Sequence, residues 1–147
     1  MRVATCAAGV LLITLALCVA ADDEVERRAR LDYILHCSGC HEMDGAGHPA
    51  FGIPDFRDQV GHYLRLPAGR AYLLQVPGLL NAGLSDERAA AVTNYVLSRF
   101  SGASLPVEFR IYSAEEAKRF RELRPADILA QRRRLLAQLS ALGYEVK

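Results

Sequence analysis

Two cysteines and a histidine stand within five residues of one another, in the stretch Cys37-Ser-Gly-Cys40-His41. The sequence has four cysteines in 147 residues, and the other two, Cys6 and Cys18, lie in an apolar N-terminal stretch. Two thiols three residues apart, with an imidazole directly after the second, place the strongest ligating side chains at one point. This motif constrains the fold most, because the rest of the chain has to be arranged around whatever these side chains bind.

Three kinds of site use such a cysteine pair, and the rest of the sequence distinguishes them. A structural zinc site needs two more ligands, and no further cysteine is available for a second cluster. A thioredoxin-like pair belongs beside a βαβ pattern, and no alternating strand pattern occurs nearby. Covalent haem attachment needs two thiols and a following histidine, as Cys37, Cys40 and His41 provide. The motif thus predicts one haem c held by two thioether bonds, with His41 as an iron ligand and His36 at the surface.

The first 21 residues have the pattern of a secretory signal peptide. A positive start precedes an almost wholly apolar run over residues 3–19, and small residues suited to cleavage follow near Ala20 or Ala21. The run over residues 3–21 is also long enough to span a bilayer, so an uncleaved anchor is the alternative. We therefore expect export to the periplasm, with membrane contact only if this segment is retained.

Composition and charge limit the partners. The formal net charge is +1 and the sequence pI is about 7.7, without the basic excess that nucleic-acid-binding proteins carry. The length and the apolar fraction of 51% suit one domain with one core. We expect no nucleic-acid partner and room for a single cofactor.

Helical patterning flanks the motif on both sides. Residues 24–37 carry apolar side chains at helical spacing, at Val25, Ala29, Leu31, Ile34 and Leu35. Residues 84–100 offer Ser85 as an N-cap and an apolar face made by Ala89, Val92, Tyr95, Val96 and Phe100. The Gly- and Pro-rich stretch 41–56 is predicted to be a loop, and residues 60–76 are predicted to form one or two short helices broken at Pro67 and Gly69.

In the motif and these flanking segments, over roughly half of its length, the chain resembles the class I c-type cytochromes. The resemblance implies an all-α, cytochrome c-like fold around one haem, in which the N-terminal and C-terminal helices cross with aromatic packing. Tyr33 and Tyr95 are the candidates for that contact. The resemblance also implies that Pro54 offers its carbonyl to the ring of His41, which makes this imidazole a stronger donor to iron.

The sixth iron position is where the sequence departs from that family. The family takes a methionine from the loop before the C-terminal helix, and here that loop reads VPGLLNAG. Met43 follows His41 by two residues, and a span of about 7 Å is too short to reach the opposite face of a ring. His48 is also close to His41 in sequence, so it reaches the opposite face of the ring only with difficulty. His62 is therefore the candidate ligand, and a vacant or water-bound position is the alternative.

Residues 102–147 extend beyond the minimal cytochrome domain, which we place at residues 22–101. Ser113 is predicted to cap a helix, and Pro125 to open a last helix whose apolar stripe comprises Ile128, Leu129, Leu135, Leu136, Leu139 and Leu142. The charges differ in sign, with 8 basic and 11 acidic residues over 22–100 but 9 and 6 over 101–147. Stripe and charge predict that this extension packs on the haem domain, with the arginines of 132–134 on a solvated face.

These features predict a protein that is not an enzyme and carries single electrons between redox proteins of the bacterial periplasm. The stretches YLLQVPG and LPVEFRIYSAEE are similar to those of bacterial cytochromes found with periplasmic dehydrogenases of small amines or alcohols, which implies such a dehydrogenase as a candidate partner. Two alternatives stay open. One is an open-site haem sensor or peroxidase-like enzyme, and the other is a cytochrome subunit of a dehydrogenase complex.

Overall fold

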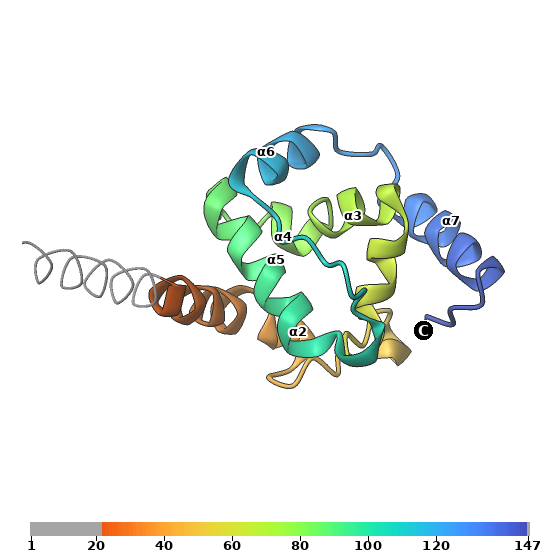
Figure 1. The fold of residues 1–147 in the computed structure, drawn as a ribbon, viewed down its shortest axis with the longest axis horizontal. Helices are drawn as coiled ribbons and strands as arrows, with labels where there is room; N and C mark the ends of the chain where they lie inside the picture. The colour runs from red at the N-terminus through yellow and green to blue at the C-terminus, as the bar shows by residue number, and fades with distance from the viewer. Residues whose placement is uncertain (1–21, 147) are drawn as a thin grey trace, which may run out of the picture.

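Helices make up the regular structure of the computed structural model, which describes residues 22–146 (Figure 1). Residues 22–36 are helical, and the elements that follow are α2 (Ser38–His41), η1 (Pro49–Phe51), η2 (Val60–Arg65), α3 (Pro67–Leu73), α4 (Pro77–Leu80), α5 (Asp86–Phe100), η3 (Gly102–Ser104), α6 (Ala114–Glu122) and α7 (Ile128–Ala141). Strand pairing within this range is limited to one isolated bridge between His48 and Ile53. The predicted all-α fold is confirmed. The predicted signal peptide lies outside the described residues.

The first helix meets α5 through aromatic side chains, as predicted. Tyr33 is 1% exposed, and its ring centroid lies 5.8 Å from that of Tyr95 and 5.2 Å from that of Phe100. Beside it, Arg88 of α5 donates two hydrogen bonds to the buried carboxylate of Asp32. An aromatic cluster and an ion pair therefore fix the crossing of these two helices.

The predicted first helix is confirmed, but its apolar pattern does not coincide with its buried face. Val25, Leu31 and Leu35 are 56%, 53% and 72% exposed, whereas Asp32 and Tyr33 are buried. In Figure 1 this helix reaches the rest of the molecule only with its C-terminal part. The inward face is thus set by the contacts that Asp32 and Tyr33 make with α5, and most of the apolar pattern faces away from the core.

A close approach joins η2 to α3. Pro67 is the first residue of α3, where its missing N–H leaves no hydrogen bond unmade, and Gly69 lies inside the helix. The predicted break at Gly69 is therefore wrong. A Cβ atom at Gly69 would lie 2.1 Å from the carbonyl oxygen of Tyr63, so only glycine allows the two segments to pack this closely.

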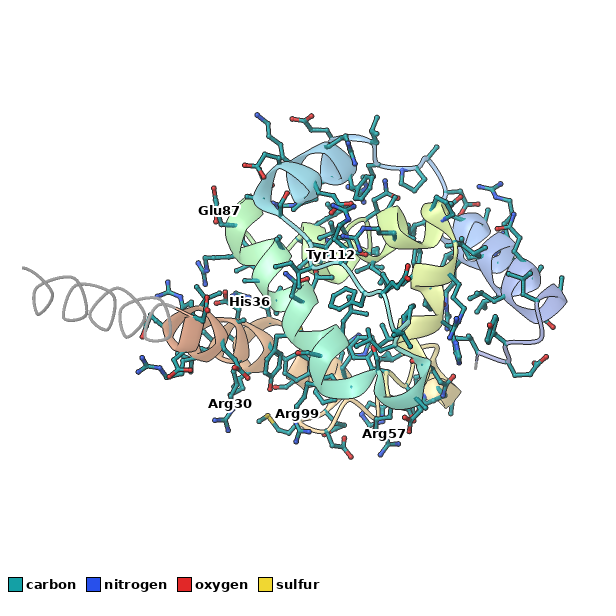
Figure 2. The ribbon with its side chains drawn as sticks, viewed as in Figure 1. Arg30, His36, Arg57, Glu87, Arg99 and Tyr112 are labelled. Carbon is teal, nitrogen blue, oxygen red and sulfur yellow. The ribbon has the colours of Figure 1, made fainter. Side chains whose placement is uncertain are left out.

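Polar contacts attach the segment before α6 to α5 and α3. The Asn94 side chain accepts from the N–H of Tyr112 at 2.8 Å and donates to its carbonyl at 3.0 Å. The Tyr112 hydroxyl donates to the carbonyl of Arg70 at 2.8 Å. Figure 2 shows Tyr112 inside the molecule, whereas Arg57 and Arg99 lie at its periphery. These bonds hold the residues after α5 back against the core.

Caps define where the helices begin. Ser85 and Ser113 accept the predicted hydrogen bonds, from the N–H groups of Arg88 and Glu116. For α7 the predicted start at Pro125 is wrong, because the carboxylate of Asp127 accepts from the N–H of Ala130 at 2.8 Å and the helix begins at Ile128.

The apolar stripe of α7 is narrower than predicted. Leu135 and Leu139 are fully buried against Tyr63 and Tyr72, whereas Leu129 and Leu142 are 64% and 58% exposed.

Within residues 22–146, no helix combines the length and the apolar character that crossing a membrane requires.

Candidate functional site

One helical turn carries the cysteine motif. Cys37 follows the first helix, and its carbonyl accepts from the N–H groups of Cys40 and His41 at 3.1 and 2.9 Å. Cys37 is half-buried and Cys40 is exposed, and both are free thiols. Burial, with the nearby negative charge of Asp32 in support, raises the pKa of the Cys37 thiol to about 11. Both sulfur atoms and the imidazole are therefore presented by a single rigid turn.

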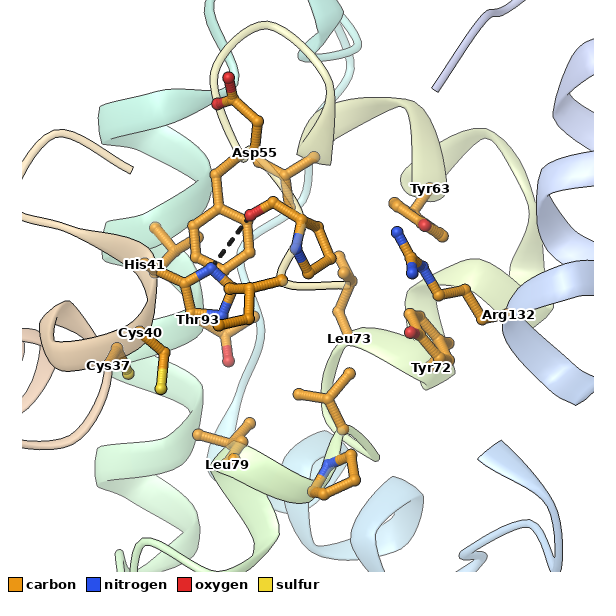
Figure 3. Close-up of a pocket in the computed structure, with 18 of the residues that line it drawn as sticks. Cys37, Cys40, His41, Asp55, Tyr63, Tyr72, Leu73, Leu79, Thr93 and Arg132 are labelled. Carbon is orange, nitrogen blue, oxygen red and sulfur yellow. Dashed lines mark hydrogen bonds between the residues drawn. The ribbon is translucent and has the colours of Figure 1, made fainter. Parts of the chain in front are cut away.

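The turn opens onto a cavity of about 430 Å³. Cys37, Cys40 and His41 lie at one end of it, and the walls come mainly from η2, α3, α4 and α5, with α7 closing the far end (Figure 3). Apolar side chains dominate these walls, among them Leu73, Val76, Leu79, Val92 and Leu97. A hollow of this kind beside two thiols and one imidazole suits a flat, largely apolar cofactor such as haem.

The His41 ring is held in one orientation. Its Nδ1 lies 3.1 Å from the carbonyl oxygen of Pro54, so the predicted contact is confirmed (Figure 3). A carbonyl oxygen only accepts, and Nδ1 therefore carries the proton, which leaves the lone pair on Nε2 free to bind a metal. Phe56 stacks on the ring at 3.9 Å between centroids. Burial lowers the pKa of His41, and the bond to Pro54 partly offsets this, so the imidazole is neutral at pH 7.

Gly47 supports this orientation, and the sequence analysis did not single it out. Its N–H donates to the carbonyl of His41 at 3.1 Å, and its φ of +58° is in the left-handed region. A Cβ atom at this position would lie 2.2 Å from the carbonyl oxygen of Pro54. A glycine in an otherwise ordinary Gly-rich loop is the only sequence signal for this role.

The structure does not bring His62 to the cavity. The His62 ring packs on Tyr144 at 4.9 Å between centroids, and His62 is not among the residues that line the cavity. His48 is exposed and bonds to Glu42 at 2.7 Å. The predicted candidate for the sixth iron ligand is therefore wrong, because η2 turns the His62 ring towards the C-terminal segment.

Methionine is also absent from the cavity wall over the described residues. Met43 is 57% exposed and does not line the cavity, in agreement with the short span that separates it from His41. His36 lines the rim next to Cys37, but its side chain is exposed. Within residues 22–146, His41 is thus the half-buried imidazole of the cavity.

The far end of the cavity is polar. Tyr63 and Tyr72 stack with their ring centroids 5.3 Å apart, and the side chain of Arg132 lies beside them (Figure 3). Arg132 belongs to the run of three arginines that was predicted to lie on a solvated face. For this residue the prediction is wrong, because the docking of α7 turns it inward.

Metal binding without a cofactor has no support in the described range. Over residues 22–146, no three or more histidine, cysteine, aspartate or glutamate side chains are grouped so that they could hold a metal ion. The residues present fit a haem, because the two thiols could anchor it covalently and the neutral imidazole of His41 could bind its iron.

Comparison with known proteins identifies the family. No family model matches the sequence, and no solved structure gives a significant match. The chain is 31% identical to a cytochrome c-552 of Thermus thermophilus over 119 residues, which cover 67% of this chain and 90% of that protein. A second cytochrome c-552, from a named strain of the same organism, is also 31% identical over 119 residues, with 80% of that protein covered. With its motif, its helices and these relatives, the chain belongs to the c-type cytochromes, the electron-transfer proteins that carry a covalently attached haem c.

Proposed function

We propose that this protein is a one-electron carrier of the bacterial periplasm, in which Cys37 and Cys40 form the thioether bonds and His41 binds the iron. The observation that carries the proposal is the His41 ring. Its Nδ1 is bonded to Pro54 at 3.1 Å, and its Nε2 is left as the only free donor of the ring, at the cavity end next to both thiols.

The residues around the cavity perform distinct tasks. A haem bound there supplies the reversible change between ferric and ferrous iron. Apolar walls exclude water, which limits the solvent rearrangement that accompanies a change of charge. The Pro54 carbonyl increases the basicity of His41 and so favours the ferric state. Cys40 is exposed, and its side of the cavity is therefore the route by which an electron reaches the surface.

Exposed apolar side chains flank that side of the cavity. Leu35 is 72% exposed and precedes His36 at the rim, and Phe51 is 85% exposed and precedes Gly52 at the rim. Such side chains favour brief contact with another protein over a large permanent interface. They support a redox protein as partner, and within that class we propose a periplasmic dehydrogenase as the electron donor.

Haem attachment is tested by removing the thiols. The double variant Cys37→Ala, Cys40→Ala should lose the haem on extraction with acidified acetone, whereas wild type keeps it and shows the added mass. Ser38→Ala is the matched control inside the motif, because its Oγ bonds only to the carbonyl of Ile34. Covalent haem in the double variant would contradict the proposal. Export is checked on the purified envelope fraction, where the mature chain should begin at Ala21 or Asp22.

A second function, that of a haem protein with an open site for small molecules, is favoured by the composition of the cavity wall. Over the described residues the wall holds neither a methionine nor the imidazole of His62, and apolar side chains such as Leu73 and Leu79 line it. We propose that the reduced protein binds carbon monoxide, and that His62→Ala leaves this binding unchanged. Unchanged visible spectra under carbon monoxide would contradict this second function.

A further inference from the structure

A half-buried cation lies at the end of the cavity away from Cys37 and Cys40. Arg132 lines the cavity, and its Nε is buried without a hydrogen-bond partner among the described residues. Asp55 is the one carboxylate among the described residues of the wall, and it is already bonded to Arg57 at 2.8 Å. A guanidinium stays charged at any relevant pH, and a partly buried charge without a counter-ion is unfavourable. An anion bound at this end would give the guanidinium a counter-ion.

Two phenol groups stand beside the guanidinium. Tyr63 and Tyr72 are 5% and 8% exposed, and both line the cavity (Figure 3). Burial raises the pKa of Tyr72 to about 12, and it raises the pKa of Tyr63 while hydrogen bonding to Arg132 partly offsets the effect. Both hydroxyl groups therefore keep their protons and can donate to an anion. One cation and two neutral donors form a site for a carboxylate.

The chemistry of the cofactor supplies that carboxylate. A haem c carries its two propionates on the edge opposite the two substituents that bond to cysteine. With Cys37 and Cys40 at one end of the cavity, the propionates of a bound haem would point towards the other end, where α7 places Arg132. We propose that Arg132, with Tyr63 and Tyr72, binds a haem propionate. This inference rests on haem attachment at Cys37 and Cys40.

The C-terminal helix is then part of the haem site. Leu135 and Leu139, which follow Arg132 on the same helix, pack on Tyr63 and Tyr72 and hold all three polar groups in one arrangement. A propionate paired with a guanidinium stays ionised to low pH. Without Arg132 the acid dissociation constant of the propionate should fall tenfold or more, which is the usual effect of losing an adjacent opposite charge. The propionate then gains its proton at a higher pH. Because an ionised propionate stabilises ferric iron, the change in reduction potential that accompanies protonation also occurs at a higher pH.

The experiment compares two neighbouring arginines in the haem-loaded protein. The reduction potential is measured against pH for wild type, Arg132→Met, Arg132→Lys and Arg133→Met. Arg133 is the matched control, since its side chain is 70% exposed and approaches only Asp127, at 4.0 Å. In Arg132→Met we expect the pH-dependent change of the reduction potential to occur at a proton concentration at least tenfold lower, that is, at higher pH. Arg132→Lys should restore much of the wild-type curve, and Arg133→Met should reproduce it.

Superimposable curves for wild type and Arg132→Met would overturn the proposal. A changed affinity for cyanide with an unchanged curve would also overturn it, because Arg132 would then act above the iron. If Arg132→Met does not fold, Tyr63→Phe and Tyr72→Phe keep the shape of the site and should shift the step in the same direction by a smaller factor. Failure of the attachment itself is separately visible as wild-type protein without covalent haem.

Discussion

Replacing Arg70 by methionine should destabilise the protein strongly, because Arg70 neutralises a buried carboxylate. Glu116 on α6 has a side chain that is only 6% exposed, and the Arg70 side chain is 15% exposed. Arg70 donates to both carboxylate oxygens, at 2.8 and 2.7 Å, and also to the carbonyls of Arg110 and Ile111. The side chain therefore joins α3 to α6 and to the segment before it.

The magnitude follows from the charge that remains. Removing one partner of a buried ion pair destabilises a protein by about 3–5 kcal/mol. Arg110 also contacts Glu116, at 3.1 Å, but its side chain is 71% exposed and compensates little. We expect Arg70→Met to lower the free energy of unfolding by about 3 kcal/mol, which corresponds to about 10 °C in the melting temperature. The double variant with Glu116→Met should be less destabilised than Arg70→Met alone, because it buries no unpaired charge.

The assay is unfolding by heat and by urea, followed by far-ultraviolet circular dichroism on the haem-loaded protein. Arg133→Met is the control, and as an exposed pair with Asp127 at 4.0 Å it should change stability by less than about 1 kcal/mol. A value for Arg70→Met within the range of that control would refute the reasoning. So would a double variant less stable than the single one.

The same ion pair predicts an acid dependence. The hydrogen bonds from Arg70 hold the pKa of Glu116 below its ordinary value. A carboxyl group with a lowered pKa in the folded state stabilises the protein above its unfolded pKa of about 4.3, and this stabilisation is lost as the pH falls through the folded value. Wild type should therefore lose more stability below a pH of about 4.3 than the double variant, as measured by urea unfolding across that range.

Two further substitutions test the site and the helix crossing. Gly47→Ala should displace the Pro54 carbonyl, which its Cβ would approach to 2.2 Å, and so raise the reduction potential; Gly83→Ala, with a φ of +67° but open space around it, is the control that should leave the potential unchanged. Tyr33→Phe should lower the free energy of unfolding by about 1 kcal/mol through loss of its 2.6 Å bond to the carbonyl of Glu42, and an unchanged urea midpoint would contradict this value.

Local features of the site could be predicted from the sequence. The spacing of Cys37, Cys40 and His41 defines a single helical turn, and the serine caps act within their own helix ends. The Pro54 contact was predicted from the family resemblance. Features of this kind depend on residues close in sequence, or on a geometry shared throughout a family.

Features that depend on distant residues could not be predicted in the same way. The inward face of the first helix follows from the pair between Asp32 and Arg88, which are 56 residues apart in sequence. Arg132 and its exposed neighbour Arg133 are alike in sequence pattern, and only the docking of Leu135 against η2 and α3 distinguishes them. The orientation of His62 likewise depends on Tyr144, far along the chain.

The position of α7 in the chain has a consequence for the order in which the walls of the cavity form. Ile128, Leu129 and Arg132 of this helix, with Val146 after it, line the cavity and follow the cysteine turn in the chain. Until α7 docks, the cavity lacks this wall, and a bulky rigid group can enter from that side before the helix closes it.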